Sequence, residues 1–316
     1  MLSVIIPSRN EQYLAKTVDD VFAKATGEIE VIVILDEKDQ KLTPRPNLIV
    51  RKKIGKPGLR SAMNQAMEIV RGKYIMKTDA HCMFGVGFDT ILSRDCEDNW
   101  IVIPRRYSLI PETWEIDHTR PAIDYEYFVF PFLPEVGPVK SGGKWYQRAK
   151  DRKELLLDEE MAFQGSCWFT TNEHLRSIGA FDTNTSTGDA FVLESEELAN
   201  KTWLSGGKCM ANKKTWYAHL YKGSYGRGYR WDKRIMRIQR EFNIDYWMHD
   251  KWPKAIHKMS WLIERFMPIP GWPQDWQDPK YEEVYVERKI KERIAREKSK
   301  KRLTMQRDRI IFMATN

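Results

Sequence analysis

The amino-acid sequence predicts an α/β fold, in which helices cover both faces of a mostly parallel sheet and a helical appendage follows at the C-terminal end. Within the first 81 residues, three largely apolar runs alternate with two segments that show the spacing of an amphipathic helix. Strands that alternate with helices are typical of βαβ units, and therefore of a parallel sheet. In such a sheet, ligands bind beyond the carboxyl ends of the strands.

The order of the elements follows from these runs and from the residues that end them. The strands are expected at "SVIIPS" (3–8), "IEVIVILDEKD" (29–39) and "KYIMKTDAH" (73–81). The helices are expected at "EQYLAKTVDDVFAKA" (11–25) and "GLRSAMNQAMEIVRG" (58–72), the second with Gly72 as its C-cap. The second strand is continuously apolar, which indicates that both of its faces are covered.

Charge and cysteine usage limit the class of protein. The chain has 316 residues and a net charge of +8, and residues 288–302 hold nine Lys/Arg against two Glu, so the rest is nearly neutral. The four cysteines form no C-x-x-C pair, which is typical of reduced thiols in a cytosolic protein. The sequence shows no signal peptide and no apolar run near the roughly 18 residues of a membrane span. We therefore expect a cytoplasmic protein, in the host cytoplasm if it is viral; the oligomeric state stays open.

Polar residues follow each of the three predicted strands. Ser8, Arg9 and Asn10 follow the first, Asp36 ends the second, and the third delivers an aspartate and a histidine to its own end. Because the carboxyl ends of parallel strands meet at one edge, these residues should form a single site. The aspartate and histidine are two residues apart, so on a regular strand they would share a face. Taken singly, each could equally be a turn residue or an ordinary polar side chain.

The ordered set of motifs resembles the GT-A fold glycosyltransferases of the family 2 type, and within them the catalytic domain of the polypeptide N-acetylgalactosaminyltransferases. "SVIIPSRNE" resembles the opening strand of that family, "VIVILDEKD" its second strand, and "GKPGLRSAMNQAMEIVRGKYIMKTDAHC" its Gly-rich turn, helix and metal strand. The family usually ends this strand in D-x-D, whereas the N-acetylgalactosaminyltransferases use D-x-H, as "DAH" does here. Further resemblances lie at 161–182, 194–208 and 216–222, so the similarity covers roughly residues 1–222.

The resemblance implies a metal site and a nucleotide-sugar donor. Asp79 and His81 of "DAH" would bind the metal together with His219 of "WYAHLYK", and Asp79 would thereby take part in catalysis. In sugar transfer the nucleotide leaves as a diphosphate, and a divalent cation neutralises the charge that develops on it. One oxygen and two nitrogen ligands suit Mn²⁺ better than Mg²⁺. The family favours UDP over GDP, so we expect a UDP-sugar as the donor.

The donor-binding residues are carried over by their place in the motifs. Pro7, Ser8 and Arg9 at the end of the first strand would frame the base and ribose of the donor. Asp36 at the end of the second strand would accept a hydrogen bond from the base or from a ribose hydroxyl. The Gly-rich turn would approach the diphosphate, because helix N-termini favour anions and glycine permits a close approach. A Gly- and Tyr-rich segment at 222–230 resembles a lid. For the basic residues a solvated surface role, and for the lid an ordinary loop, remain open alternatives. The residues are Pro7, Ser8, Arg9, Asp36, Gly58, Arg60, Asn64, Tyr225 and Arg227.

An acidic cluster at 194–197 corresponds to the E-D-x-E-L motif of the family. The usual general base is replaced by Ser195, which cannot accept a proton at neutral pH. The N-acetylgalactosaminyltransferases also lack this Asp and retain the anomeric configuration, so the resemblance favours a retaining enzyme. An inverting enzyme that uses Glu194 or Glu196 is the alternative, and Glu197 corresponds to a family carboxylate that meets acceptor or sugar. A solvated helix turn would also explain four polar residues in a row.

The remaining segments bear on the acceptor. We expect a glycosyltransferase domain at 1–230 (nucleotide-sugar half 1–115, acceptor half and lid 116–230), a helical appendage at 231–280 and a basic helical tail at 281–316. The basic segment 288–302 favours DNA with hydroxymethylated pyrimidines as acceptor. Alternatives are a polysaccharide, lipid-linked glycan or protein acceptor, and a nucleotide-sugar-binding protein without catalysis. For the tail itself, a solvated or partner-binding helix remains open.

Overall fold

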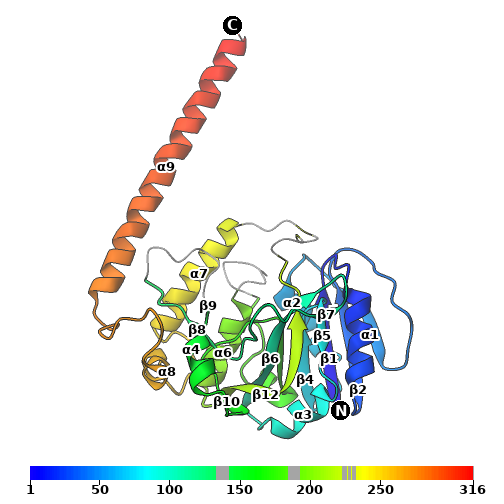
Figure 1. Cartoon of the computed structure of the whole chain (residues 1–316). Coiled ribbons are helices and arrows are strands. Elements are labelled where there is room, and N and C mark those ends of the chain that lie inside the picture. The colour runs from blue at the N-terminus through cyan, green and yellow to red at the C-terminus, as the bar shows by residue number, and fades with distance from the viewer. Residues whose placement is uncertain (133–141, 184–192, 223–225, 227–228, 230–232, 316) are drawn as a thin grey trace. The chain divides into compact units, whose positions relative to one another are not determined.

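A large mixed sheet forms the centre of the computed structural model, which describes residues 1–132, 142–183, 193–222, 226, 229 and 233–315 (Figure 1). In spatial order its strands are β10 (Leu157–Glu159), β12 (Lys208–His219), β6 (Trp100–Ile110), β11 (Cys167–Thr171), β4 (Tyr74–Thr78), β1 (Leu2–Ser8), β2 (Ile29–Leu35) and β3 (Leu48–Lys52). β5 (Cys82–Phe84) pairs with β12, and β7 (Glu115–Ile116) pairs with β6. A separate two-stranded sheet consists of β8 (Glu126–Phe128) and β9 (Gly142–Lys144).

The direction of the strands confirms the predicted α/β fold. β4, β1, β2 and β3 are consecutive parallel neighbours, and β6 is parallel to β12. β11 runs antiparallel between β4 and β6 and so joins the two parallel groups. As a consequence β1, β2, β4, β6 and β12 all point the same way, and their carboxyl ends lie at the same edge of the sheet.

Helices pack on this sheet through their apolar faces. The helices are α1 (Leu14–Lys24), α2 (Leu59–Met67), α3 (Phe88–Asp95), α4 (Tyr146–Asp151), α5 (Asn172–Ser177), α6 (Glu194–Leu204), α7 (Lys233–Met248) and α8 (Met259–Phe266). In α1, Leu14, Val18 and Val21 recur at helical spacing and are buried in the main core. Every residue of β2 is also buried, and alternate residues of the strand belong to the same core. The packing on both faces of β2 explains its continuously apolar sequence.

The second predicted helix is shorter than expected. It ends at Met67, and the prediction that Gly72 caps it is wrong. Gly72 instead donates its N–H to Ser3 Oγ at 2.8 Å, and a Cβ at this position would lie 2.7 Å from the Ser3 nitrogen. The glycine is therefore required by its close approach to β1 rather than by a helix end.

Contacts divide the chain into two units, Met1–Val129 with Gly137–Pro270, and Phe130–Val136 with Gly271–Asn316. In the second unit, Phe130 packs edge-on against Trp272 and Tyr281, and Phe132 against Tyr285. α9 (Lys280–Thr315) gives the predicted C-terminal tail its helical form. Of the helices that the structure describes, none combines the length and the apolar character needed to cross a bilayer. The predicted boundaries at residues 230 and 280 remain predictions.

Candidate functional site

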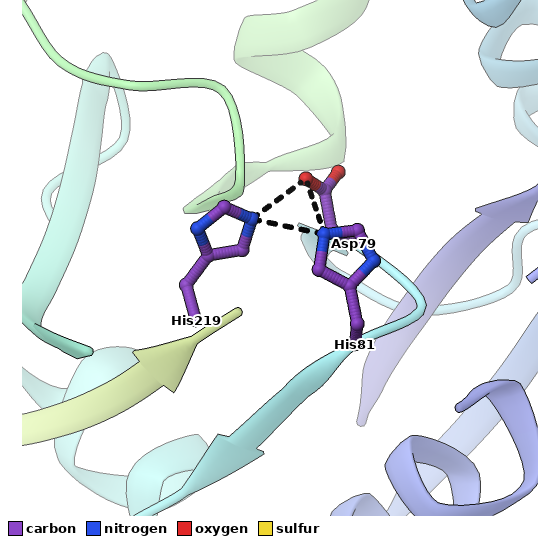
Figure 2. Close-up of side chains that lie close together, drawn as sticks. All are labelled: Asp79, His81 and His219. Carbon is purple, nitrogen blue, oxygen red and sulfur yellow. Dashed lines mark hydrogen bonds and ion pairs between the residues drawn. The ribbon is translucent and has the colours of Figure 1, made fainter. Parts of the chain in front are cut away.

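Three side chains converge at the carboxyl edge of the sheet (Figure 2). His81 Nε2 lies 3.1 Å from His219 Nε2, and Asp79 Oδ2 lies 3.3 Å from His219 Nε2 and 3.8 Å from His81 Nε2. Among the described residues, these are the group of His, Cys, Asp and Glu whose ligand atoms could hold one metal ion. Bonds of about 2.0–2.2 Å from one cation leave neighbouring ligand atoms about this far apart. The arrangement therefore fits the predicted metal site.

Strand pairing brings these three residues together. Asp79 follows the last residue of β4, and its N–H donates to the Ser166 carbonyl at 2.8 Å, just before the antiparallel neighbour β11 begins. β5 pairs antiparallel with the end of β12, with Cys82 opposite His219. His81 immediately precedes β5, so this pairing places its ring beside that of His219. The ring centroids are 4.8 Å apart, although the residues are 138 positions apart in sequence.

The electrostatics of the triad suit a cation. Burial opposes ionisation of Asp79, but the Lys77 ammonium 2.5 Å away and the two imidazoles hold the pKa of this carboxyl well below its ordinary value. Burial also lowers the pKa of His219 to about 4, against the opposing pull of Asp79. At neutral pH the triad therefore presents a carboxylate and, at His219, a neutral imidazole with a lone pair for a metal.

Two residues that sequence reasoning did not single out support the triad. Glu11 Oε2 lies 3.1 Å from His81 Nδ1, on the side of the ring opposite the other two members, and the Lys222 ammonium binds the same carboxylate. Lys77 contacts Asp79 and donates to the Gly165 carbonyl. The sequence contains only weak indications of these two residues. Glu11 ends the quoted "SVIIPSRNE" motif, and Lys77 lies two residues before Asp79, so the two would share a face of the metal strand. A carboxylate on the outer nitrogen fixes the orientation of a metal-binding imidazole.

The predicted donor residues of the first two strands lie along the same edge. Pro7 and Ser8 are paired with Ile34 and Leu35 of β2, so the ends of the two strands are in register. The Gly58 N–H donates to Asp36 Oδ2 at 3.0 Å, which ties the second strand end to the start of α2. Burial raises the pKa of Asp36, although that hydrogen bond acts against the shift.

Arg9 and Asn64, two further predicted donor-binding residues, have different contacts. The Arg9 guanidinium bonds Glu37 at 2.6 Å and lies 4.6 Å from the centre of the Tyr229 ring. Asn64 is turned toward another segment and donates to the Phe181 carbonyl at 2.9 Å. Tyr225 and Arg227 lie outside the residues that the structure describes. For all of these, contact with a donor remains a prediction.

The acidic cluster forms the start of α6, and its two predicted catalytic glutamates differ in their surroundings. Glu197 is held by the Lys201 ammonium at 2.6 Å, the Arg60 guanidinium at 3.2 Å and the Asp182 N–H at 3.0 Å. Glu194 has no hydrogen bond or ion pair with any described residue, and it packs so closely on Gly165 that a Cβ there would meet its Oε1 at 2.2 Å. Burial raises the pKa of Glu194 to about 7, against the opposing field of Lys77. Ser195 between them donates to Glu196 at 3.1 Å.

The comparison with known families finds a similarity, and it lies in the part of the chain that carries the D-x-H residues. Residues 3–156 match the family described as "Glycosyl transferase family 2". The chain is therefore similar to family 2 glycosyl transferases over just under half of its length. The metal strand β4 and the D-x-H residues fall within the matched range, whereas α6 and His219 lie beyond it. A search of the curated proteins gives no match.

One solved structure, that of GalNAc-T7, confirms the predicted GT-A fold. The structure of GalNAc-T7 with UDP, GalNAc and Mn²⁺ aligns with a TM-score of 0.63 at 17% identity, over 90% of this chain and 55% of that one. The chain thus spans about half the length of GalNAc-T7. The S. aureus protein TarS aligns at 12% identity over 83% of this chain and 41% of that one, with a TM-score of 0.48. The mannosyltransferase PcManGT from Pyrobaculum calidifontis aligns at 17% identity over 71% and 58%, with a TM-score of 0.43.

Proposed function

We propose that this protein is a metal-dependent glycosyltransferase that moves a sugar from a nucleotide-sugar donor to a hydroxyl group. The observation that carries the proposal is the convergence of Asp79, His81 and His219 at the carboxyl edge of a GT-A sheet. The family 2 match and the fold shared with GalNAc-T7 support it. An intact triad argues against the alternative of a binding protein without catalysis, because binding alone does not require neutralisation of a leaving group.

The donor half of the site would act mainly by electrostatics. A bound divalent cation would supply positive charge at the diphosphate that departs from the sugar. Asp79 and the two imidazoles would hold it, Lys77 would keep Asp79 ionised, and Glu11 would orient His81. UDP and Mn²⁺ are the donor nucleotide and metal that we propose, and their presence in the GalNAc-T7 structure supports both. Asp36 and the end of β1 would then meet the base and ribose.

The stereochemistry is decided by what accepts the proton of the acceptor hydroxyl. Retention needs no protein base if the leaving phosphate takes the proton, and Ser195 at the usual base position supports this route. Inversion requires a base, and Glu194 supports that route, because a carboxyl with a pKa of about 7 can exchange protons at neutral pH. The anomeric configuration of the product, measured by NMR, distinguishes the two.

The acceptor class is the finer part of the proposal. The charge of residues 288–302 supports a DNA acceptor with hydroxymethylated pyrimidines. A glycan, lipid-linked glycan or protein acceptor remains the alternative. Neither assignment affects the chemistry at the metal.

The first experiment needs no acceptor. Transferases hydrolyse their donor slowly with water, so the protein with Mn²⁺ and a panel of UDP- and GDP-sugars should release nucleoside diphosphate from at least one of them. EDTA and Asp79→Ala should stop the release, whereas the exposed carboxylate variant Asp19→Ala should not. Hydrolysis that survives EDTA, or the absence of hydrolysis and of nucleotide binding with every donor, would contradict the proposal. Hydroxymethylated DNA and glycan acceptors are then added to the active donor.

A further inference from the structure

A second cavity lies beside the proposed catalytic site, in the first unit of the chain. It has a volume of about 360 Å³ and lies between α6, the segment after α5, and α7 with the loop that follows it. That volume falls within the range of roughly 300–1,000 Å³ that is usual for small-molecule sites. The ion pair between Arg60 and Glu197 lines it, and Arg60 also acts electrostatically on Glu194. The cavity and the catalytic carboxyl therefore share α6.

One wall of the cavity is aromatic. Phe242 and Tyr246 of α7 stack with their centroids 5.3 Å apart and an interplanar angle of 18°, and Trp247 meets Tyr246 edge-on at 5.0 Å. Trp252 completes the wall and meets Trp247 at 6.2 Å. Rings that are fixed in this way offer flat apolar faces at low entropic cost.

Other residues that line the cavity are polar and deeply buried. Arg60, Glu197 and Lys201 are 2%, 6% and 5% exposed, and the two cations bind the same carboxylate. Gln239, which is 1% exposed, also lines the cavity, and its amide oxygen has no hydrogen-bond partner among the described residues. A buried polar atom without a partner costs free energy unless a ligand or water satisfies it.

The combination of aromatic and polar lining residues matches a sugar ring. A pyranose presents C–H groups on one face, which pack on aromatic rings, and hydroxyls on its edge, which need donors and acceptors. The charges that line the cavity are nearly balanced, with Arg60, Lys201 and Lys254 against Asp182 and Glu197. A track for a nucleic-acid backbone requires an excess of positive charge as well as stacking rings. The balance favours a neutral, hydroxyl-rich ligand over a polyphosphate.

We propose that this cavity binds a sugar unit of a saccharide acceptor, with Tyr246 as the stacking ring and the amide of Gln239 as the hydrogen-bonding group. Asn243 also lines the cavity, where its amide donates to the Gln239 carbonyl and accepts from the Trp247 indole N–H. The proposal rests on the proposed function and deepens it by naming the acceptor class: a glycan, in place of the DNA acceptor that the charge of residues 288–302 supports. The sugar in the cavity would hold the acceptor so that its terminal hydroxyl reaches the site near Glu194. Tyr246 and Gln239 are then positioning residues that do not touch the reacting atoms.

The test measures binding without transfer. Methyl glycosides of glucose, galactose, mannose, N-acetylglucosamine and N-acetylgalactosamine are added to the full chain at millimolar concentration, and saturation-transfer NMR detects contact. We expect a signal from at least one of them, its loss in Tyr246→Ala, and its persistence in the matched control Ile238→Ala. Ile238 is an exposed residue of the same helix that does not line the cavity. A cavity-narrowing variant, Asn243→Tyr, should also abolish the signal.

Separate readouts keep this proposal distinct from the proposed function. Tyr246→Ala should leave UDP and Mn²⁺ binding and donor hydrolysis unchanged, while raising the KM of any saccharide acceptor about tenfold or more, the effect of losing about 1.4 kcal/mol of binding. No signal from any glycoside, or a signal that survives both cavity variants, overturns the sugar site even if the enzyme transfers sugar. Binding of a single-stranded oligonucleotide that disappears in the same two cavity variants would also overturn the sugar site, and would assign the cavity to nucleic acid.

Discussion

Asp79 and Glu194 are two carboxyls in the field of the same lysine, yet their pKa values shift in opposite directions. Asp79 is in contact with the Lys77 ammonium at 2.5 Å and faces two imidazoles, which stabilise its charge despite burial. Glu194 is buried against Gly165 without a bonded partner among the described residues, so burial dominates and its pKa rises to about 7. Direct contact makes the first carboxyl a permanent anion, suited to a metal. Burial, the largest cause of the raised pKa of Glu194, makes the second one able to exchange a proton.

The largest loss of activity is expected when the metal-binding carboxylate of Asp79 is removed. Asp79→Ala should reduce sugar transfer by about 10³- to 10⁴-fold, because the cation contributes several kcal/mol to stabilisation of the leaving diphosphate. Circular dichroism should show a folded protein, since Asp79 is a partly exposed residue beyond the end of its strand. Transfer at the wild-type rate in this variant would remove Asp79 from the mechanism.

Glu194→Gln tests whether Glu194 acts as the base that accepts the proton of the acceptor hydroxyl. If Glu194 is the base, the variant should lower kcat by about 10²-fold or more. The base must be ionised, so wild-type kcat/KM should fall as the pH drops below about 7, and this limb should be absent in the variant. A bound cation favours the carboxylate and would move the midpoint to lower pH. A wild-type profile that is flat from pH 5 to 8, together with a retained anomeric configuration, would instead favour the leaving phosphate as the proton acceptor.

Glu11→Gln probes the orientation of the histidine ligand. A carboxylate that contacts the outer nitrogen of a metal-binding imidazole typically contributes about 10- to 100-fold to metal affinity. We expect a weaker Mn²⁺ affinity of that size by calorimetry, with partial recovery in Glu11→Asp. Unchanged Mn²⁺ affinity in Glu11→Gln would reduce the 3.1 Å contact with His81 to a packing contact.

The smallest effect is expected from the basic tail. Lys289, Lys291, Arg293 and Arg296 lie in the part of α9 whose side chains the structure describes, so they can be changed together to Gln. With a saccharide acceptor, KM and its salt dependence should not change. With a DNA acceptor, each lost phosphate contact would flatten the slope of log K against log salt by about 0.9. A flattened slope would therefore restore DNA as the acceptor and weaken the sugar-site proposal.

The sequence predicted those parts of the site that depend on local order. The strand ends and the spacing of Asp79 and His81 follow from apolar periodicity, and the resemblance supplied His219, which no spacing rule reaches. The contact of Glu11 with His81 could not be predicted, because it joins the loop after β1 to the residue before β5, 70 positions away in sequence. Gly72 was misjudged because its close neighbour is Ser3 of β1, far away in sequence. The lining of the second cavity likewise combines residues of α6 and α7, which the periodicity of neither segment specifies.

The most direct test of the account is an Mn²⁺ titration followed by electron paramagnetic resonance, in the presence of UDP. Wild-type protein should bind one Mn²⁺, and nitrogen couplings should show two imidazole ligands. Asp79→Ala and His219→Ala should each lose this site. Glu194→Gln should keep it, because Glu194 is proposed to exchange a proton and is not a metal ligand. Unaltered Mn²⁺ binding in Asp79→Ala, or a bound Mn²⁺ without imidazole nitrogens, would contradict the account.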